Sequence, residues 1–236
     1  MPKSGKLYKA NASKVDRSKR YSVDEALSII DSYQPRKFDE SVELVVKLGV
    51  DPKQSDQMVR GAAVLPNGIG KTIRVACFVK GEAEKEAREA GADFVGTDEF
   101  IEKVEKGWLE FDRLLTTPEA LKDLTKLAKI LGPKGMMPNK KTGTVTNEIG
   151  KAVKEQKLGK VEYKVEKAGI VHTIIGKKSF GPQKLKQNLL VLFENILKAK
   201  PPTSKGVYVR KVALAPTMGP SVILDSQSVE SLARSL

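Results

Sequence analysis

Two short segments of the sequence place lysines beside glycine, hydroxyl or aromatic side chains, and a third combines a threonine, a methionine and a glycine. Lysine neutralises phosphates, an aromatic ring stacks on a base, and glycine lets backbone amides approach a phosphate closely. The side chains are Lys37, Phe38 and Ser41 in the first segment, Lys167, Gly169, His172, Lys177 and Ser179 in the second, and Thr217, Met218 and Gly219 in the third. One interpretation of these segments is a surface that binds a polynucleotide.

Each segment also fits a purely structural role. Phe38 can pack under a sheet with solvated charges around it, and His172 can be a structural residue of a strand. Residues 217–219 can be no more than a tight turn, although their hydroxyl, thioether and glycine would also fit an RNA minor groove. The 2′-hydroxyl in that groove offers both a donor and an acceptor. Side-chain chemistry alone leaves both interpretations open.

Several kinds of catalytic and metal site are disfavoured by composition. The single cysteine, Cys77, excludes an internal disulfide and indicates a reducing compartment. With His172 as the single histidine, no zinc site of the usual type and little room for a catalytic triad remain. The run 65–72 ends like a phosphate-binding loop, but Leu65 stands where that motif needs a glycine, and Lys71 opens a predicted strand. We therefore expect a hinge or turn there, and no cofactor.

The net charge points to a polyanionic partner. The 236 residues include 42 Lys and Arg against 29 Asp and Glu, which leaves +13 and a pI near 9.6. Residues 161–236 hold 12 basic and 5 acidic side chains, or +7. The basic first 20 residues are followed by no apolar core, and no apolar stretch approaches the ~20 residues of a membrane span. These features predict a cytosolic protein that binds nucleic acid.

The two ends of the chain share a mixed helix and strand pattern. Residues 22–33 predict a helix, because Ser22 and Glu25 fit a capping box. Alternation predicts a strand at 41–50. Further expected elements are a hairpin of 161–166 and 169–175, a helix at 182–199, strands at 207–215 and 221–224, and a frayed tail at 225–236.

The middle of the chain alternates regularly between strands and helices. The expected strands are 72–79, 93–95 and 111–115, and the expected helices are 82–90, 98–106 and 118–131. This order is typical of a small parallel sheet with helices on its faces. Charge divides the same region, because residues 82–119 hold 5 basic and 12 acidic side chains while residues 120–160 hold 10 and 3.

The change of pattern predicts two domains. Residues 1–67 and 161–236 would form a discontinuous α+β domain, and residues 68–160 an inserted, Rossmann-like α/β domain. Gly68, Gly70 and Gly159 lie at the two crossings and could form a hinge. One continuous domain with two loops is the alternative that the pattern leaves open.

Several long motifs agree in order with those of one known family. They are residues 37–43, 47–52, 55–57, 59–61, 91–93, 107–112, 130–135, 137–139 and 217–222. Through them the sequence resembles, over about residues 3–224, the L-one family of bacterial large-subunit ribosomal proteins, the stalk proteins. Residues 225–236 extend past the short C-terminus that the family often has.

The resemblance implies a fold, a partner and a site. The family's two domains, one made from both chain ends, favour the inserted arrangement. Its members bind a three-helix junction of large-subunit rRNA, so the eleven residues named above become the expected RNA site. The family also implies a mobile stalk in the cytoplasmic ribosome that helps deacylated tRNA leave the exit site. It further implies repression of the protein's own operon mRNA.

Two competing functions remain at this stage. An inserted α/β layer often binds nucleotides, so a nucleotide-binding enzyme is one alternative. The absence of a glycine-rich fingerprint after residues 72–79 argues against it, since Gly81 stands alone there. The second alternative is a dedicated mRNA repressor without a ribosomal role.

Overall fold

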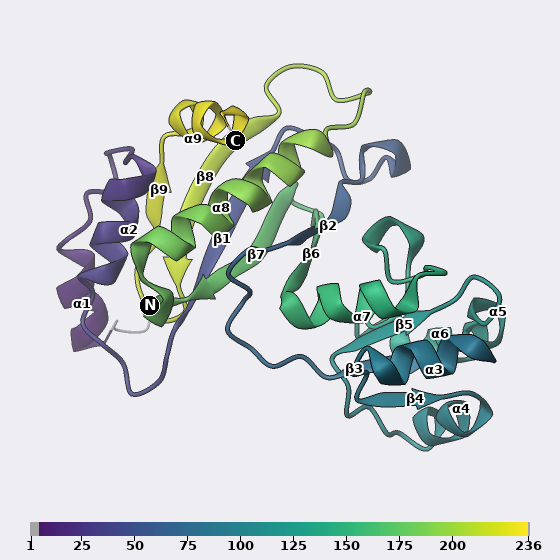
Figure 1. Cartoon of the computed structure of the whole chain (residues 1–236). Helices are drawn as coiled ribbons and strands as arrows, with labels where there is room; N and C mark the ends of the chain where they lie inside the picture. The colour runs from purple at the N-terminus through teal and green to yellow at the C-terminus, as the bar shows by residue number, and fades with distance from the viewer. Residues whose placement is uncertain (1–4, 236) are drawn as a thin grey trace. The chain divides into compact units, whose positions relative to one another are not determined.

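The structure, a computed structural model, describes residues 5–235 and divides the chain into two compact units (Figure 1). The terminal unit combines Met1–Gly70 with Val161–Leu236, and the central unit is Lys71–Lys160. The terminal unit contains an antiparallel sheet, and the central unit contains a separate parallel sheet. The predicted mixture of α+β and α/β structure is therefore confirmed.

A four-stranded sheet in the order β7-β1-β8-β9 organises the terminal unit. Its strands are β1 (Ser41–Leu48), β7 (Ile170–Lys177), β8 (Val209–Pro216) and β9 (Val222–Leu224). All pairs within it are antiparallel. The predicted strand at 41–50 is confirmed, and every second residue of β1 from Val42 to Leu48 is buried while the others are half-buried or exposed. One face of the sheet is thus apolar, and the other is accessible.

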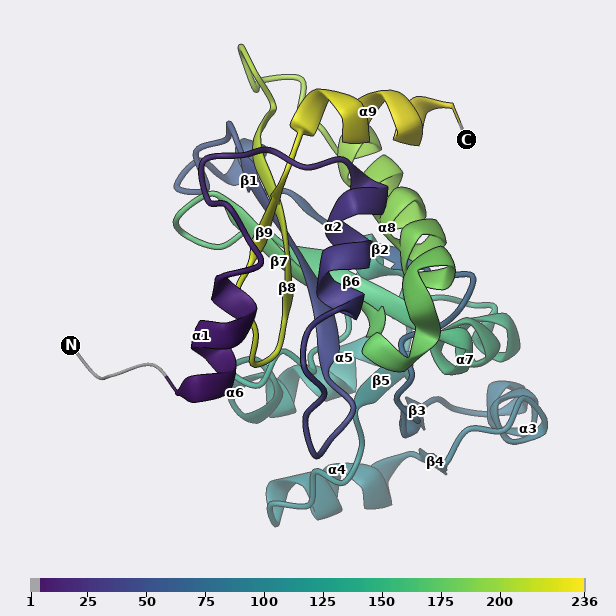
Figure 2. The ribbon, with the colours of Figure 1, turned by 90° about the vertical axis from the view of Figure 1, so that its left-hand side faces the viewer.

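Helices pack on the apolar face. Figure 2 shows α2 (Val23–Asp31) and α8 (Gly181–Lys198) on the same side of the strands. The predicted capping box is confirmed, because Ser22 Oγ accepts from Glu25 N at 3.3 Å and Glu25 Oε2 accepts from Ser22 N at 3.1 Å. The predicted apolar stripe of α8, from Leu185 to Ile196, is buried in the core that these helices share with the sheet. A short further helix, α1 (Lys6–Ala12), precedes them.

The frayed tail predicted at 225–236 is wrong. The chain forms helix α9 (Ser226–Arg234), and the carboxylate of Asp225 caps it by accepting from Gln227 N at 3.4 Å and Ser228 N at 3.3 Å. Val229 and Ala233, four residues apart on one face, are buried against the rest of the terminal unit. Leu236 lies outside the described residues.

The hairpin predicted for 161–166 and 169–175 is wrong in its pairing. Strand β6 (Lys160–Lys164) pairs with β2 (Arg60–Val64) in a separate two-stranded sheet, while β7 pairs with β1. Only the turn is shared, through the bridge between Val165 and Val171 and the bond from Glu166 N to Ile170 O at 2.9 Å. Strand β6 therefore pairs with a strand that is distant in the sequence and not with its neighbour β7.

The central unit has the predicted three-stranded parallel sheet, in the order β4-β3-β5. The strands are β3 (Val75–Phe78), β4 (Phe94–Gly96) and β5 (Arg113–Thr116). Helices α3 (Glu82–Glu89) and α4 (Asp98–Glu105) connect them as expected. An additional helix, α7 (Ile149–Leu158), contacts α3, β3 and β5.

The single helix predicted at 118–131 is divided. Helix α5 (Leu121–Leu124) is followed by a 3₁₀ turn, Thr125–Leu127, and then by α6 (Ala128–Leu131). Residues 118–120 form a turn and not the first turn of a helix. Thr125 Oγ1 donates to Leu121 O at 3.3 Å, the kind of hydrogen bond by which hydroxyl residues compete with regular helix.

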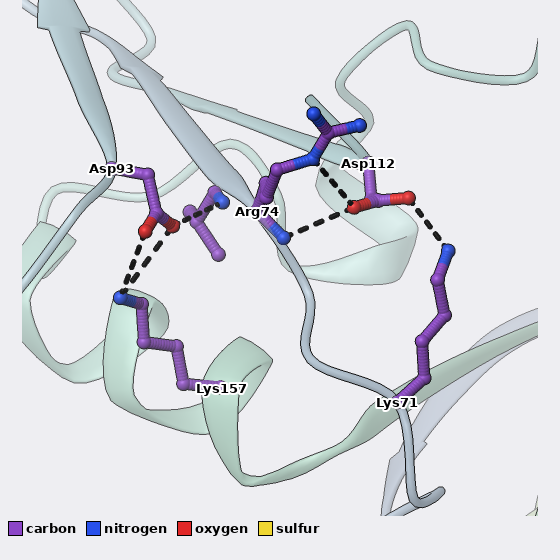
Figure 3. Close-up of polar contacts among 6 residues, drawn as sticks. Lys71, Arg74, Asp93, Asp112 and Lys157 are labelled. Carbon is purple, nitrogen blue, oxygen red and sulfur yellow. Dashed lines mark hydrogen bonds and ion pairs between the residues drawn. The ribbon is translucent and has the colours of Figure 1, made fainter. Parts of the chain in front are cut away.

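A polar network fixes the starts of the three parallel strands (Figure 3). Asp112 accepts from Lys71 Nζ at 2.7 Å and from Arg74 N at 3.1 Å, just before β5 and β3 begin. Asp93, before β4, accepts from Val75 N at 2.8 Å and pairs with Lys157 Nζ at 3.5 Å. The hydrogen bond from Lys71 is the main reason that the pKa of Asp112 lies below its usual value.

Candidate nucleic-acid interface

The antiparallel sheet brings most of the predicted site residues together at one end of its strands. Ser41, the first residue of β1, pairs with Lys177 at the end of β7, and Val42 pairs with Pro216 at the end of β8. Segments more than 130 residues apart in the sequence therefore meet there. We call this group the strand-end cluster; its members are Lys37, Phe38, Ser41, Lys177, Ser179, Thr217, Met218 and Gly219.

Ser41 and Thr217 form the centre of the strand-end cluster. Ser41 N donates to Thr217 Oγ1 at 3.0 Å, and Thr217 N donates to Ser41 O at 3.0 Å. Thr217 Oγ1 also lies 3.2 Å from Ser41 O. Lys177 Nζ donates to Ser41 Oγ at 2.8 Å. The two hydroxyls and the ammonium are thus fixed in position before any ligand arrives, which lowers the entropy cost of binding.

The turn that carries Met218 and Gly219 is rigid. Met218 N donates to the carboxylate of the buried Glu40 at 2.9 Å, and Arg36 Nη2 donates to Met218 O at 3.1 Å. A Cβ on Gly219 would lie 2.5 Å from Pro216 Cγ and 3.1 Å from the ring of Tyr33. Only glycine fits this position without displacing its neighbours, so the shape of the turn depends on Gly219.

The side chain of Tyr33 packs against the same turn. Its hydroxyl donates to Pro220 O at 3.2 Å, and the side chain is buried. Burial raises the pKa of Tyr33, so the hydroxyl stays protonated and remains a donor at neutral pH. On the other side, Ser179 donates through N and Oγ to the carboxylate of Asp39, at 3.2 and 2.6 Å.

Two large apolar side chains of the cluster are accessible. Phe38 is 53% exposed and Met218 is 52% exposed. The alternative in which Phe38 packs under the sheet is therefore excluded. Exposed aromatic and thioether side chains near lysines can pack on the bases and sugars of RNA. A single exposed apolar residue elsewhere on a surface needs no such explanation.

Three predicted residues lie away from the strand-end cluster. Lys167 and Gly169 adjoin the start of β7, where Ile170 pairs with Lys47. Six residues of β1 separate that pair from Ser41, or about 20 Å at the usual rise of a strand. His172 lies between the two ends on the accessible face, opposite Val45, with Nε2 3.6 Å from Glu166 Oε1. The structure therefore spreads the predicted site along the sheet.

Sequence analysis missed the residues that hold the cluster in place. They are Tyr33, Arg36, Asp39, Glu40 and Lys178. Arg36, Asp39 and Glu40 directly neighbour the predicted Lys37, Phe38 and Ser41, so their position was a signal. Their partners are 140 or more residues away, however, and no local pattern reveals that.

The proposed hinge glycines have conformations that other residues rarely adopt. Gly68, Gly70 and Gly159 have φ angles of 66°, 69° and 106°. On the first crossing, Asn188 anchors the chain to the terminal unit, because Asn188 Nδ2 donates to Gly68 O at 2.9 Å. Gly159 follows the end of α7. These conformations are compatible with a hinge, whose motion stays a prediction.

The described part of the chain holds no metal-binding cluster, and its one cysteine, Cys77, is buried. Within residues 5–235 no three His, Cys, Asp or Glu side chains are grouped to hold a metal. Burial raises the pKa of the Cys77 thiol to about 12, so it is not a nucleophile at neutral pH. In the same range no helix is both long and apolar enough to cross a membrane.

A net charge of +13, together with lysines beside an accessible aromatic side chain, is typical of nucleic-acid-binding proteins. The family model of the ribosomal protein L1p/L10e family matches residues 30–220. A curated relative, the large ribosomal subunit protein uL1 of Solidesulfovibrio magneticus, is 53% identical over 232 residues, which cover 98% of this chain and 99% of the relative. The chain therefore belongs to the ribosomal protein L1p/L10e family.

This membership decides one of the open alternatives. The family consists of ribosomal proteins and not of enzymes, so the nucleotide-binding enzyme on the central unit is excluded. The resemblance seen in the sequence motifs is confirmed.

Proposed function

We propose that this protein is a component of the large ribosomal subunit that binds 23S-type rRNA through the strand-end cluster. The observation that carries the proposal is the turn of Thr217, Met218 and Gly219. It is held by Ser41, Glu40, Arg36 and Tyr33, and it presents the exposed Met218. The exposed Phe38 belongs to the same segment as Arg36 and Glu40, whose side chains bond the backbone of Met218. A rigid projection of this kind suits recognition of RNA by shape.

Charge and shape have separate roles in the proposed contact. Lysines that neutralise phosphates release counterions, so the affinity should fall steeply as salt rises. The turn cannot adapt without breaking its hydrogen bonds, so it selects RNA folds that already complement it. The combination favours a folded RNA such as the three-helix junction that the family binds, over an arbitrary single strand.

Filter binding to a transcribed three-helix-junction fragment of large-subunit rRNA tests the proposal. We expect Thr217→Val and Met218→Asp each to weaken binding by about 1–3 kcal/mol, the range for a lost or unpaired buried polar contact. Thr203→Val and Met58→Asp are matched controls, because both residues are accessible and belong to the terminal unit but not to the strand-end cluster. Ser204, next to Thr203, donates to Gly49 O, past the end of β1 that is opposite to Ser41. Unchanged affinity in both cluster variants would remove the strand-end cluster from the interface.

The finer role that we propose is a mobile stalk that helps deacylated tRNA leave the exit site. Support comes from the two compact units and from the left-handed glycines on both crossings. We propose that the units are the two separate domains, with the central unit moving while the terminal unit stays on rRNA. Ribosomes that lack the protein should release exit-site tRNA more slowly, and re-addition should restore the rate. An unchanged rate would reject this role.

We also propose that the same cluster represses translation of the protein's own operon. An mRNA that folds like the rRNA junction would present the same shape to residues 217–219. Titration with both RNAs separates the possibilities. Comparable binding in which Thr217→Val weakens both supports autoregulation by one site. A strong preference for the mRNA would instead favour a dedicated repressor.

A further inference from the structure

A basic cavity lies at the opposite end of the same sheet from the strand-end cluster. It has a volume of about 270 Å³ and is bordered by the segment before Tyr21, the start of β8, the end of β9 and the first residue of α9. Its charged lining residues are Arg17, Lys19, Arg20, Arg210 and Lys211, and no acidic residue lines it. We call it the basic pocket.

Backbone pairing builds the basic pocket. Tyr21 N donates to Ile223 O and Asp225 N donates to Tyr21 O, both at 2.9 Å, so residues 17–20 are held beside β9. On β8, Lys211 pairs with Lys47 and Val209 pairs with Leu48, so Arg210 is the extra residue of a β-bulge. The bulge leaves both Arg210 and Lys211 exposed.

Most of these positive charges have no protein partner. Among residues 5–235, no ion pair involves Arg17, Arg20, Arg210 or Lys211, whereas Lys19 pairs with Glu25 at 3.7 Å. The two carboxylates adjoining the lining segments are occupied by local hydrogen bonds. Asp16 accepts from Ser18 N at 2.9 Å and from Ser18 Oγ at 2.7 Å, and Asp225 caps α9.

The sheet beside the pocket also places two positive charges directly against each other. Lys47 and Lys211 are directly opposite each other in the β1–β8 pairing, and both are exposed. Like charges in directly opposite positions destabilise a sheet. A bound polyanion would turn this repulsion into attraction. Solvent counterions screen these exposed charges in the free protein, and a bound polyanion would release them.

We propose that the basic pocket binds backbone phosphates of the RNA that the strand-end cluster recognises; this inference rests on the proposed function. Strand β8 runs from the pocket to the turn at Thr217, and the seven residues from Arg210 correspond to about 23 Å. Together with Lys47, six basic side chains extend along this end of the sheet, more than one phosphate requires. A chain of phosphates is therefore the occupant that the charges fit, and the second contact adds affinity without reading bases.

The test compares two double variants with the same loss of charge. Arg210→Gln with Lys211→Gln alters the pocket, and Lys184→Gln with Lys198→Gln alters exposed positions on α8, on the other face of the sheet. Filter binding to the junction fragment is measured over a series of salt concentrations. For the pocket variant, we expect the steepness of the fall of log affinity with log salt to decrease by about 1–2. Its affinity should be roughly tenfold weaker at ~0.1 M salt. The α8 variant should change the affinity less than about twofold.

Two further measurements keep the outcome interpretable. Without RNA, Lys211→Gln alone should keep or raise the thermal midpoint, because it removes the like-charge pair with Lys47. In a backbone-cleavage footprint, the pocket variant should lose protection of one RNA segment while the segment protected by the strand-end cluster stays protected. A lowered thermal midpoint would contradict the proposed repulsion.

The two proposals can fail separately. If the unaltered protein does not bind the junction fragment, the proposed function fails. If it binds, but the pocket variant keeps the full salt slope and footprint, the pocket proposal is overturned. Inorganic phosphate or vesicles of anionic lipid that bind the pocket at concentrations where RNA does not would likewise overturn the assignment to RNA.

Discussion

The exposed ring of Phe38 offers the sharpest test of the interface, because it separates RNA binding from stability. The ring is 53% exposed beside the strand-end cluster, and it makes no aromatic pair among the residues that the structure describes. Phe38→Ala therefore removes apolar surface that the folded chain leaves largely in water. We expect the substitution to weaken RNA binding and to leave folding almost unchanged.

The expected loss follows from the area that RNA can cover. Full burial of a phenylalanine side chain contributes about 1.5–3 kcal/mol. Just over half of the ring remains accessible, so covering it contributes about 0.8–1.6 kcal/mol. This range corresponds to a loss of affinity of about 4- to 15-fold. Stacking on a base would place the result toward the upper end, since such contacts are worth about 1–3 kcal/mol.

The assay is a filter-binding titration with the junction fragment, combined with urea unfolding of each variant. Leu158→Ala is the matched control, because Leu158 is 64% exposed and ends α7 in the central unit. Both variants should keep the free energy of unfolding within about 0.5 kcal/mol, as is usual for accessible positions. Only Phe38→Ala should weaken binding. Equal affinities of the two variants would refute the placement of Phe38 at the interface.

Two further predictions concern stability. Asp112→Ala should lower the free energy of unfolding at neutral pH by about 1 kcal/mol, because the 25%-exposed carboxylate loses Lys71 and Arg74. The folded-state pKa of Asp112 is depressed, so this contribution is present above the unfolded-state pKa of about 3.9 and is lost as pH falls through the lower folded-state pKa. Urea unfolding at neutral and acid pH should therefore show a smaller difference in free energy of unfolding between Asp112→Ala and the unaltered protein at acid pH. A difference that stays constant with pH would contradict the ion pair. Val229→Ala, which truncates a fully buried side chain of α9, should cost about 2 kcal/mol in thermal or urea unfolding, and a cost near zero would restore the idea of a frayed tail.

Local signals were sufficient where a few neighbouring residues determine the structure. Ser22 and Glu25 satisfy each other's backbone amides within one turn, so the start of α2 could be predicted from two letters. The alternation from Ser41 to Leu48 likewise reports one buried face, whatever strand lies beside it. Most helices and strands of both units belong to this class.

The elements that were predicted wrongly or not at all depend on partners distant in the sequence or have weak local signals. Strand β6 was paired with its sequence neighbour β7, but it pairs with β2, about 100 residues earlier in the chain. Helix α9 was missed because its buried side is small, essentially Val229 and Ala233 among serines. Helix α7 was missed although its stripe includes Ile149 and Val153, because the buried polar Gln156 interrupts the apolar pattern.

The prediction of the interface divides in the same way. Residues proposed to touch RNA, such as Phe38 and Met218, could be named from the sequence because their segments match motifs of the family, whereas side-chain chemistry alone left a structural role open. Residues that orient them, such as Glu40 and Tyr33, act on partners 178 and 187 residues away and become visible only in the fold. The carboxylate of Glu40 even has the wrong charge for an RNA site, so composition alone would have excluded it.

The spread of the predicted residues along the sheet has a consequence for how RNA is bound. Lys167 and Gly169 adjoin the start of β7, where Ile170 pairs with Lys47, and Lys47 also pairs with Lys211 of the basic pocket. His172 lies between this end and the strand-end cluster on the same accessible face. An RNA that touched only residues 217–219 would leave these groups without a ligand. His172 lies on β7, beyond β1 as seen from β8. An RNA that covered the accessible face of β7, β1 and β8 from the turn to the pocket would also cover His172, so His172→Ala should weaken binding of the full junction fragment but not that of a fragment too short to reach the pocket. Equal losses with both fragments would confine the contact to the strand-end cluster.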